Sequence, residues 1–513
     1  MPDLDFLASH AEALPHKPAV ILGDRKVDFA ALDRAANRAA RVFKSLGCEA
    51  GDRVAVMSFN SIEGFEIANG LRRAGMVVVP VNYRLRGPEI AYVLNDSGAR
   101  VVLAGPDHVD AVMAAAGEVK GDVRFVALGE RVPEGWLSYG ALMEHAAGRW
   151  QPVYAAADGL AASMIYTSGT TGHPKGAWRP NGVDLANVLQ VISIFELSQS
   201  DVHLMCGPGY HSAVSFFSAL HQVLGATVVT QPKFEAEGAL DAIARHRVTT
   251  VFLAPTLLQR LVDAQQKKPR DISSLRALIL GAAPCPHALK VHAEAVFGKV
   301  LWEFYGATET GINTVLRPED QLSKPGSCGT AVPGQEIRLV DAAGNDVVEG
   351  EPGELMVRNT WLAEYYQRPD ATGKSLHDGF FSVGDVAYRD AEGYYYICDR
   401  RIDMVISGGV NIYPAEIEAV LHAHPSVLDA AVIGVPDEQW GESVKAVVQL
   451  RADGAKVTEE ELIAFCAERL ASYKKPRSID FCPLNSELPR DAAGKLLKRK
   501  IREPYWSAAG RRI

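Results

Sequence analysis

The chain has 513 residues, of which 48% are hydrophobic and 22% are charged, and its formal net charge is −9. A single hydrophobic core does not grow to this length, so two or more domains are expected. The negative charge argues against a general nucleic-acid binder, which needs a basic surface. No apolar run approaches the length that spans a bilayer.

The cysteines and the first residues of the sequence indicate the cellular compartment of the protein. Seven cysteines are scattered without a C-x-x-C pair, which favours neither a zinc site nor a disulfide framework and suits a reducing cytoplasm. Asp3 and Asp5 stand where a secretory signal would be basic, and no long apolar run follows them, so no signal peptide is expected. The sequence leaves open the oligomeric state, a homo-oligomer included, and loose association with a membrane surface.

The first 280 residues alternate helical patterns with short apolar strands. Apolar residues recur at helical spacing between Asp28, a suitable N-cap, and Gly47, a suitable stop. The elements predicted next are strands at 53–57, 77–79 and 101–103, with helices at 61–73 and 88–95. The alternation returns with strands at 228–229, 251–253 and 278–280 and helices at 240–246 and 256–263. This pattern predicts layered parallel α/β sheets with covered faces.

The pattern changes toward residue 400. Residues 353–358 and 393–397 read as strands of a β-rich subdomain. Beyond them Pro414 begins a helix, residues 427–434 and 444–450 read as strands, and a capping box at Thr458 opens a helix that is expected to reach Ala471. The sequence therefore predicts a large N-terminal domain over 1–399, a hinge at 400–402 and a small, mobile α+β domain over 403–513.

Residues 163–177 read S-M-I-Y-T-S-G-T-T-G-H-P-K-G-A. Glycines let the backbone approach a phosphate, hydroxyls donate hydrogen bonds, and a lysine adds a positive charge. The stretch is not a Walker loop, since Pro174 precedes the lysine and Gly176 follows it. A polar surface loop is the structural alternative. The residues predicted to cradle phosphates are Thr167, Ser168, Gly169, Thr170, Thr171, Gly172 and Lys175.

This stretch resembles the phosphate-binding loop of the acyl-adenylate-forming enzymes, a superfamily that includes acyl-CoA synthetases and aryl-CoA ligases. The resemblance implies an enzyme that uses ATP to convert a carboxylic acid into an acyl-adenylate, releases pyrophosphate, and transfers the acyl group to coenzyme A. It implies ATP, Mg²⁺ and coenzyme A as the small molecules bound. A ligase that loads a carrier protein, and a homologue that binds nucleotide without catalysis, are the alternatives.

Further motifs follow in the family's order. Residues 305–310, Y-G-A-T-E-T, resemble the motif whose threonine, here Thr308, contacts the α-phosphate and whose glutamate, here Glu309, holds Mg²⁺. One carboxylate is enough for a cation that bridges phosphates, although a lone glutamate is more often a solvated loop acid. By the same resemblance Asp385 and Arg400 bind the ribose. The residues that would form the two walls of the adenine site are Gly281, Ala282, Ala283, Glu303, Phe304, Tyr305 and Gly306.

The acyl pocket is indicated by residues 208–211, P-G-Y-H, which resemble the motif at its mouth. A lone histidine is more often structural, so both roles stay open for His211. Amino-acid-activating relatives carry an acidic residue in their substrate motif that binds the substrate amine, and no such residue occurs at the corresponding position of this sequence. Small and aromatic residues predict an apolar fatty or aryl acid; they are Ala213, Ala282, Ala283, Ala307, Phe216 and Phe217.

The C-terminal motifs complete the resemblance. Residues 489–495, P-R-D-A-A-G-K, resemble the motif whose lysine, here Lys495, drives adenylation. A solvated basic tail is the structural alternative. Ser407, Gly408 and Gly409 match the loop that lines the pantetheine tunnel, and Ile402 occupies the hinge position. Two aromatic residues, Trp440 and Tyr473, resemble those that stack on the adenine of coenzyme A, or else are partly exposed packing residues.

Overall fold

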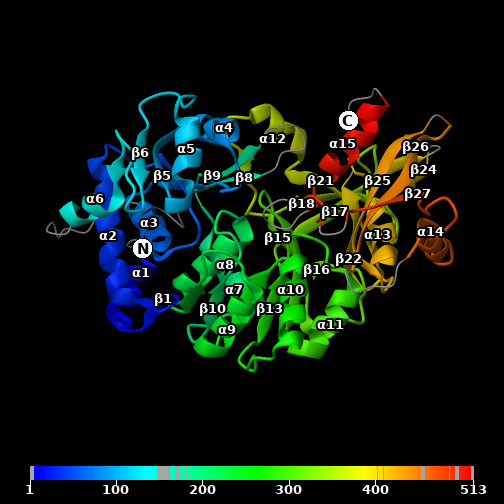
Figure 1. Cartoon of the computed structure of the whole chain (residues 1–513), viewed down its shortest axis with the longest axis horizontal. Coiled ribbons are helices and arrows are strands. Elements are labelled where there is room, and N and C mark those ends of the chain that lie inside the picture. Colours follow the sequence, from blue (N-terminus) through cyan, green and yellow to red (C-terminus); the bar gives the residue numbers. More distant parts are fainter. Residues whose placement is uncertain are drawn as a thin grey trace.

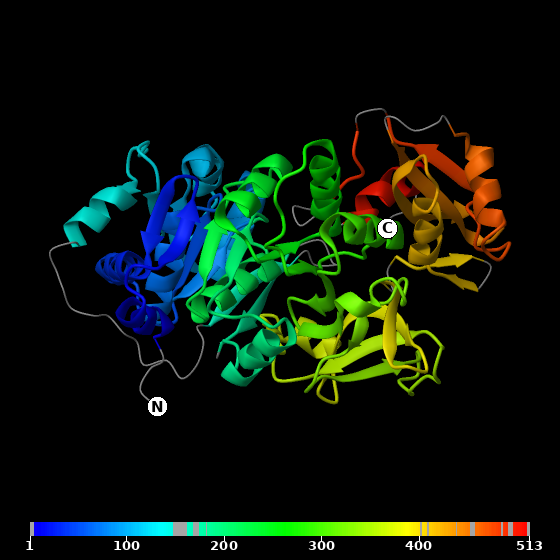
Figure 2. The ribbon, with the colours of Figure 1, turned by 90° about the horizontal axis from the view of Figure 1, so that it is seen from below.

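The computed structural model describes residues 5–146, 162–167, 174–180, 182–400, 403–407, 410–437, 439–451, 457–483, 486–490 and 496–509. A large body built from the first 400 residues carries a small C-terminal domain at one end (Figures 1 and 2). The predicted fold class is confirmed. The hinge bounds stay a prediction, because residues 401 and 402 lie outside the described residues. Within the described residues no helix has the length and apolar character needed to cross a membrane.

The first sheet of the body is parallel throughout. Its strands, in spatial order, are β4 (Val77–Pro80), β3 (Arg53–Met57), β5 (Ala99–Ala104), β6 (Arg124–Ala127) and β7 (Leu137–Ser138). The helices that cover it are α2 (Phe29–Ser45), α3 (Ile62–Arg73), α4 (Gly87–Ser97), α5 (Val109–Ala116) and α6 (Tyr139–Ala146). The predicted cap is confirmed: the Asp28 carboxylate accepts a hydrogen bond of 2.7 Å from the backbone N–H of Ala31, which satisfies an unpaired donor at the start of α2.

A second sheet forms the centre of the body. Its parallel part runs in the order β14 (Leu301–Ala307), β13 (Ala277–Leu280), β12 (Thr250–Leu253), β10 (Val202–Met205), β11 (Thr227–Thr230) and β1 (Pro18–Leu22), with antiparallel β2 (Arg25–Asp28) at its edge. Every residue of β11, β12 and β13 is buried, as expected of parallel strands covered on both faces. The covering helices are α7 (Leu185–Ile194), α8 (Ser212–Val223), α9 (Ala236–His246), α10 (Pro255–Lys267) and α11 (His287–Phe297).

Beyond β14 the same sheet becomes antiparallel, which confirms the predicted β-rich subdomain. Its strands continue as β15 (Gly311–Leu316), β16 (Gly329–Ala331), β22 (Tyr394–Arg400), β21 (Phe380–Arg389), β18 (Gly353–Arg358) and β17 (Glu336–Val340), with β20 (Leu376–His377) on β21. A small antiparallel sheet joins β8 (Ser163–Thr167), β9 (Lys175–Arg179) and β19 (Glu364–Tyr365). The remaining helices of the body are α1 (Phe6–Ala13), α12 (Pro369–Ser375) and two 3₁₀ turns at Pro106–His108 and Pro318–Asp320.

The C-terminal domain is an α+β unit with its own core. Its sheet contains β24 (Val410–Ile412), β23 (Val405–Ser407), β26 (Gly441–Leu450), β25 (Val427–Asp437) and β27 (Ser478–Phe481). Its helices are α13 (Pro414–His422), α14 (Glu459–Ala467) and α15 (Lys498–Ala508). The capping box at Thr458 is confirmed, but α14 ends four residues before the predicted Ala471. The backbone N–H groups of Arg469 and Leu470 both turn back to the carbonyl of Cys466, and Leu470 packs on the domain core.

Candidate active site

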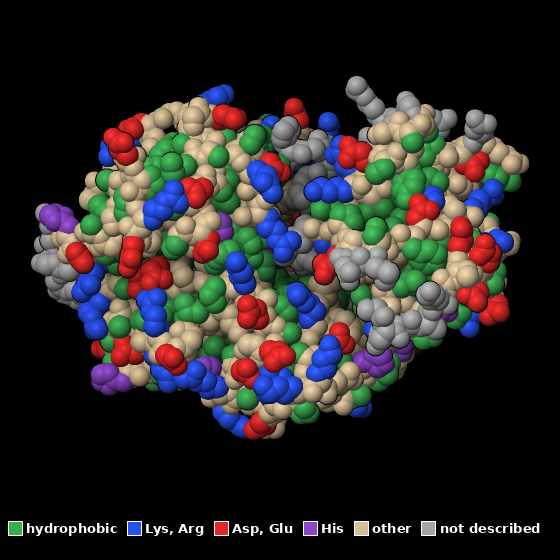
Figure 3. All heavy atoms as spheres, in the orientation of Figure 1, with side chains coloured by type: hydrophobic (Ala, Val, Ile, Leu, Met, Phe, Trp, Pro, Cys, Tyr) green, Lys and Arg blue, Asp and Glu red, His purple; other side chains and the backbone are tan. Residues whose placement is uncertain are grey.

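A cavity of about 1970 Å³ extends from the body to the C-terminal domain. Its walls come from β14 and β15, from the start of α8, from β21, and from α13 and the segment before α15. Figure 3 shows one face of the molecule, with a hollow between the body and the C-terminal domain and several Lys and Arg side chains around it. The cavity therefore combines surfaces from both parts of the chain.

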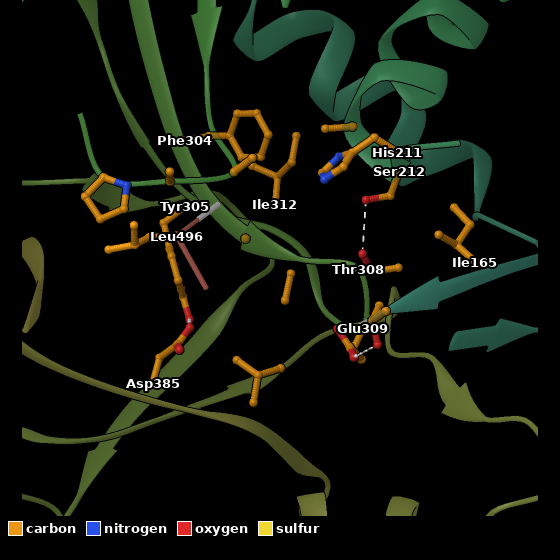
Figure 4. A pocket seen from close by; sticks show the side chains of 18 of the residues that line it. Ile165, His211, Ser212, Phe304, Tyr305, Thr308, Glu309, Ile312, Asp385 and Leu496 are labelled. Carbon is orange, nitrogen blue, oxygen red and sulfur yellow. Dashed lines mark hydrogen bonds between the residues drawn. The ribbon is translucent and has the colours of Figure 1, made fainter. Parts of the chain in front are cut away.

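Thr308 and Glu309 lie together on the loop between β14 and β15, and other hydroxyls orient them. The Oγ atoms of Ser212 and Thr308 are 3.0 Å apart (Figure 4). Thr167 donates a hydrogen bond of 3.1 Å to Glu309 Oε1, and the Tyr365 hydroxyl donates one of 3.0 Å to the same oxygen. Glu309 is only 7% exposed, so its carboxylate is both buried and fixed in direction.

Asp385 lies across the cavity from this cluster (Figure 4). The Tyr305 hydroxyl donates a hydrogen bond of 2.6 Å to Asp385 Oδ2. Asp385 is opposite Arg400 in the ladder that joins β21 to β22, so the predicted ribose residues share one stretch of sheet. The side chain of Arg400 lies outside the described part of the chain. Gly384, with φ +81°, supplies the left-handed backbone that turns this strand toward the cavity.

The predicted adenine walls face each other at the ends of β13 and β14. A Cβ atom on Gly281 would lie 2.9 Å from the ring of Phe304, so only glycine allows this approach. Ala282 has φ 71°, a strained conformation for a residue with a side chain. Glu303 was predicted to form part of an adenine wall, and its carboxylate forms a buried ion pair with Lys290.

The part of the cavity where the sequence predicted the acyl pocket is apolar, and His211, the N-cap of α8, lines it. The residues that line it include Ala213, Phe216, Ala282, Ala283, Ala307, Ile312 and Trp361. Phe217, which the sequence placed near the pocket, is fully buried instead and stacks on Phe252 with ring centroids 5.6 Å apart. It supports the wall from behind, because successive residues of a helix point in different directions.

Two of the predicted loop residues lie at the ends of strands. Lys175 pairs with Thr167 in the β8–β9 ladder, and its Nζ lies 4.7 Å from the centre of the Tyr365 ring. Ser407 ends β23, opposite Val410. The predicted residues that fall outside the described residues are Ser168, Gly169, Thr170, Thr171, Gly172, Ile402, Gly408, Gly409 and Lys495.

Two aromatic residues of the C-terminal domain stand out at the surface. Trp440 is 38% exposed and Tyr473 is 52% exposed. The Arg477 guanidinium lies 5.1 Å from the Trp440 ring, and Lys474 Nζ lies 5.8 Å from the Tyr473 ring. Exposed rings with cations beside them suit a flat, anionic ligand.

Comparison with known proteins decides the family. The models for the AMP-binding enzyme and for the AMP-binding enzyme C-terminal domain match residues 7–367 and 416–495. The chain belongs to the AMP-binding enzymes. It is an AMP-forming acid–thiol ligase of the acyl-CoA synthetase branch.

The relatives of this AMP-binding enzyme match it from end to end. A feruloyl-CoA synthase from an Amycolatopsis species is 36% identical over 499 residues, which cover 96% of this chain and 97% of that protein. A long-chain-fatty-acid–CoA ligase from Mycobacterium tuberculosis is 35% identical, with 94% of each chain covered. The crystal structure of ATP-bound MatB from Rhodopseudomonas palustris has a TM-score of 0.86 at 31% identity and covers 98% of both chains.

The structure of this AMP-binding enzyme adds site residues that the motifs did not indicate. Ser212 and Tyr365 hold Thr308 and Glu309, as described above. Arg179 lines the cavity from β9 and is 8% exposed. In the sequence, Arg179 was indicated only by its spacing from Lys175, because residues 175, 177 and 179 of a strand share a face.

A buried ion cluster joins the two parts of this AMP-binding enzyme. Lys498 Nζ of α15 lies 3.0 Å from Asp399 Oδ2, on the last strand of the body, and 3.0 Å from Glu418 Oε1 of α13. Burial alone would lower the pKa of Lys498, but the carboxylates of Asp399 and Glu418 outweigh it and raise that pKa. No motif pointed to this cluster, because Lys498 read as one cation of a basic tail.

Proposed function

We propose that this enzyme activates an apolar fatty or aryl carboxylic acid in the cavity between its two domains. An oxygen of the acid attacks the α-phosphorus of ATP, and pyrophosphate leaves. The thiolate of coenzyme A then attacks the carbonyl carbon of the acyl-adenylate, and AMP leaves. The observation that carries the proposal is the convergence of Thr308, Glu309 and Asp385 on one cavity with an apolar wall.

Each polar group of the body has a proposed task. Asp385, oriented by the Tyr305 hydroxyl, accepts hydrogen bonds from the ribose. Thr308, oriented by Ser212, donates to the α-phosphate. Such preorganised donors stabilise the charge that develops in the transition state. Lys495 supplies a further cation at the α-phosphate.

The residues present fit Mg²⁺ bound together with the phosphates of ATP. Glu309 receives two hydroxyl hydrogen bonds on Oε1 and none on Oε2 within the described residues. No cluster of three or more His, Cys, Asp or Glu side chains suited to a metal occurs in that part of the chain. Mg²⁺ commonly binds one or two carboxylates and takes its other ligands from phosphates and water. Bound there, it would neutralise charge on the phosphate oxygens.

Coenzyme A is proposed to approach from the C-terminal domain. Trp440 and Tyr473 would stack on its adenine, and Arg477 would face its phosphates. The loop that begins at Ser407 would line the path of the pantetheine arm.

The proposal is tested by following pyrophosphate release and thioester formation over a panel of straight-chain, aryl and ring-bearing acids. We expect pyrophosphate release with at least one apolar acid, and a coenzyme A thioester of the same acid in the mass spectrum. Acyl transfer only to a phosphopantetheine-bearing carrier protein would instead identify a carrier-loading ligase. Release with no acid of the panel would contradict the proposal.

A further inference from the structure

Arg179 is a buried cation that the proposed reaction does not use. It is the last residue of β9, is 8% exposed and lines the cavity. Its Nε donates a hydrogen bond of 2.7 Å to the carbonyl of Trp361, and a terminal nitrogen donates one of 2.5 Å to the carbonyl of Thr308. Trp361 lies on the acyl wall and Thr308 lies on the phosphate side. Arg179 therefore stands between the two halves of the substrate site.

The positive charge of Arg179 lies beside neutral hydrogen-bond acceptors. Among the described residues no Asp or Glu forms an ion pair with its guanidinium, and both of its hydrogen bonds go to neutral carbonyls. Burial lowers the pKa of Arg179 to about 10, and the more distant charge of Glu309 offsets this only in part. An uncompensated buried charge is destabilising, and within the described residues three of the five guanidinium N–H groups donate to no acceptor.

A purely structural role does not account for the choice of arginine. Two backbone carbonyls can be bridged by neutral donors, such as the amide of glutamine, without burying a charge. The chain contains a contrasting case in Lys290, whose buried cation is matched by the carboxylate of Glu303. Within the described residues Arg179 has no such partner at ion-pair distance, and the cavity that it lines gives an anion access to its guanidinium.

We propose that Arg179 is an anion-binding residue that receives an oxyanion of a reactant in the active-site cavity. The inference rests on the proposed function, since the reactants are those of an acyl-CoA synthetase. Two sources share this chemistry: a second carboxylate on the acid, and a phosphate oxygen of ATP or pyrophosphate. Arginine suits both, because its planar fork matches carboxylate and phosphate oxygens.

The test compares Arg179→Gln with Arg179→Lys. Glutamine keeps donors for the two carbonyls but removes the charge, whereas lysine keeps the charge. Arg260→Gln, at an exposed position of α10, is the control for loss of a cation elsewhere. Each protein is assayed for the KM of ATP, for binding of inorganic pyrophosphate by calorimetry, and for kcat/KM on matched acids such as hexanoate with adipate and benzoate with terephthalate.

The two sources predict different results. If the acid supplies the anion, Arg179→Gln loses roughly 10- to 100-fold in kcat/KM on the dicarboxylic acid alone, and Arg179→Lys recovers part of the loss. If the nucleotide supplies it, the KM of ATP and the Kd of pyrophosphate rise by a similar factor for every acid. Equal losses in both variants, with unchanged ligand discrimination and a lower Tm, would show a structural brace and overturn the proposal.

Pyrophosphate binding separates this inference from the proposed function. The calorimetric measurement needs no turnover, so a change on Arg179→Gln supports the anion site even if no acid of the panel is activated. Conversely, if the wild-type enzyme turns over and Arg179→Gln has the same KM of ATP, Kd of pyrophosphate and kcat/KM, the proposed function stands and the role of Arg179 is rejected.

Discussion

The body and the C-terminal domain contribute to the active site in different ways. In the body, Thr308, Glu309 and Asp385 lie on or between strands of one continuous sheet, and each is held by a hydrogen bond of 3.1 Å or less. The C-terminal domain presents exposed rings and connects to the body through the Lys498 cluster. The difference suggests that the body recognises ATP and acid in a preformed site, while the C-terminal domain brings groups needed in only one half of the reaction.

The largest effect is expected for Lys495→Ala. Loss of a preorganised charge at the α-phosphate typically reduces the rate by about 10²–10³, so adenylation should fall by this factor. Thioester formation from supplied acyl-adenylate and coenzyme A should be spared, because we propose that Lys495 acts in the first half-reaction alone. An equal fall in both half-reactions would refute this assignment.

Asp385→Ala tests the body. Hydrogen bonds with one charged partner contribute roughly 1.5–3 kcal/mol each, so the KM of ATP should rise by one to two orders of magnitude. Tyr305→Phe removes only the hydroxyl that orients Asp385 and should raise this KM less. Steady-state kinetics with ATP as the varied substrate measures this KM. An unchanged value in Asp385→Ala would remove Asp385 from the site.

Lys498→Met tests the connection between the two regions. It leaves the carboxylates of Asp399 and Glu418 facing each other without a cation, and breaking a buried ion pair destabilises that arrangement by about 3–5 kcal/mol. We expect adenylation to fall roughly tenfold, because fewer molecules hold the C-terminal domain over the cavity. Thioester formation from supplied adenylate should fall less.

Two further variants control for this result. Arg499→Met, an exposed neighbour in α15, should behave as wild type. Asp399→Asn combined with Lys498→Met should be milder than the sum of the single changes, because the two residues share one interaction. Strict additivity would contradict a direct connection between the domains.

The smallest effect on activity concerns the interior of the body and its response to pH. His221 donates through Nδ1 to the carbonyl of Phe217 at 2.7 Å, and its Nε2 lies 2.9 Å from Thr250 Oγ1, which lies 3.0 Å from His203 Nδ1. When both imidazole rings are neutral, a single arrangement of protons satisfies every hydrogen bond in this series. Burial lowers the pKa of His221 to about 4.

Because the unfolded chain binds a proton near pH 6.5 and the folded His221 does not, stability is full above that pH and falls as the pH drops toward 4. At pH 5 the loss from His221 is about 2 kcal/mol. Urea unfolding at pH 7 and pH 5 should show it, and His221→Asn should show a smaller difference between the two pH values. An equal difference in both proteins would exclude His221 as the source.

The sequence predicted the local elements well where one periodicity dominated. The strands at 53–57 and 353–358 are confirmed residue for residue, because apolar runs between polar turns leave few alternatives. The helix after Thr458 was predicted too long. It ends earlier because packing Leu470 on the domain core stabilises the chain more than another helical turn would. Its capping signal was local, whereas its end depends on a tertiary contact.

The family motifs, and hence the residue types of the site, could be predicted from the sequence, because phosphates and ribose demand particular donors and acceptors at short spacing. Which of these residues meet depends on the three-dimensional fold. Tyr305 bonds to Asp385 across 80 residues, Lys498 reaches Asp399 across 99, and Arg179 touches Thr308 across 129. Such contacts follow from the order of strands in the sheet and the docking of one domain on another, and neither is encoded in the periodicity of any single segment.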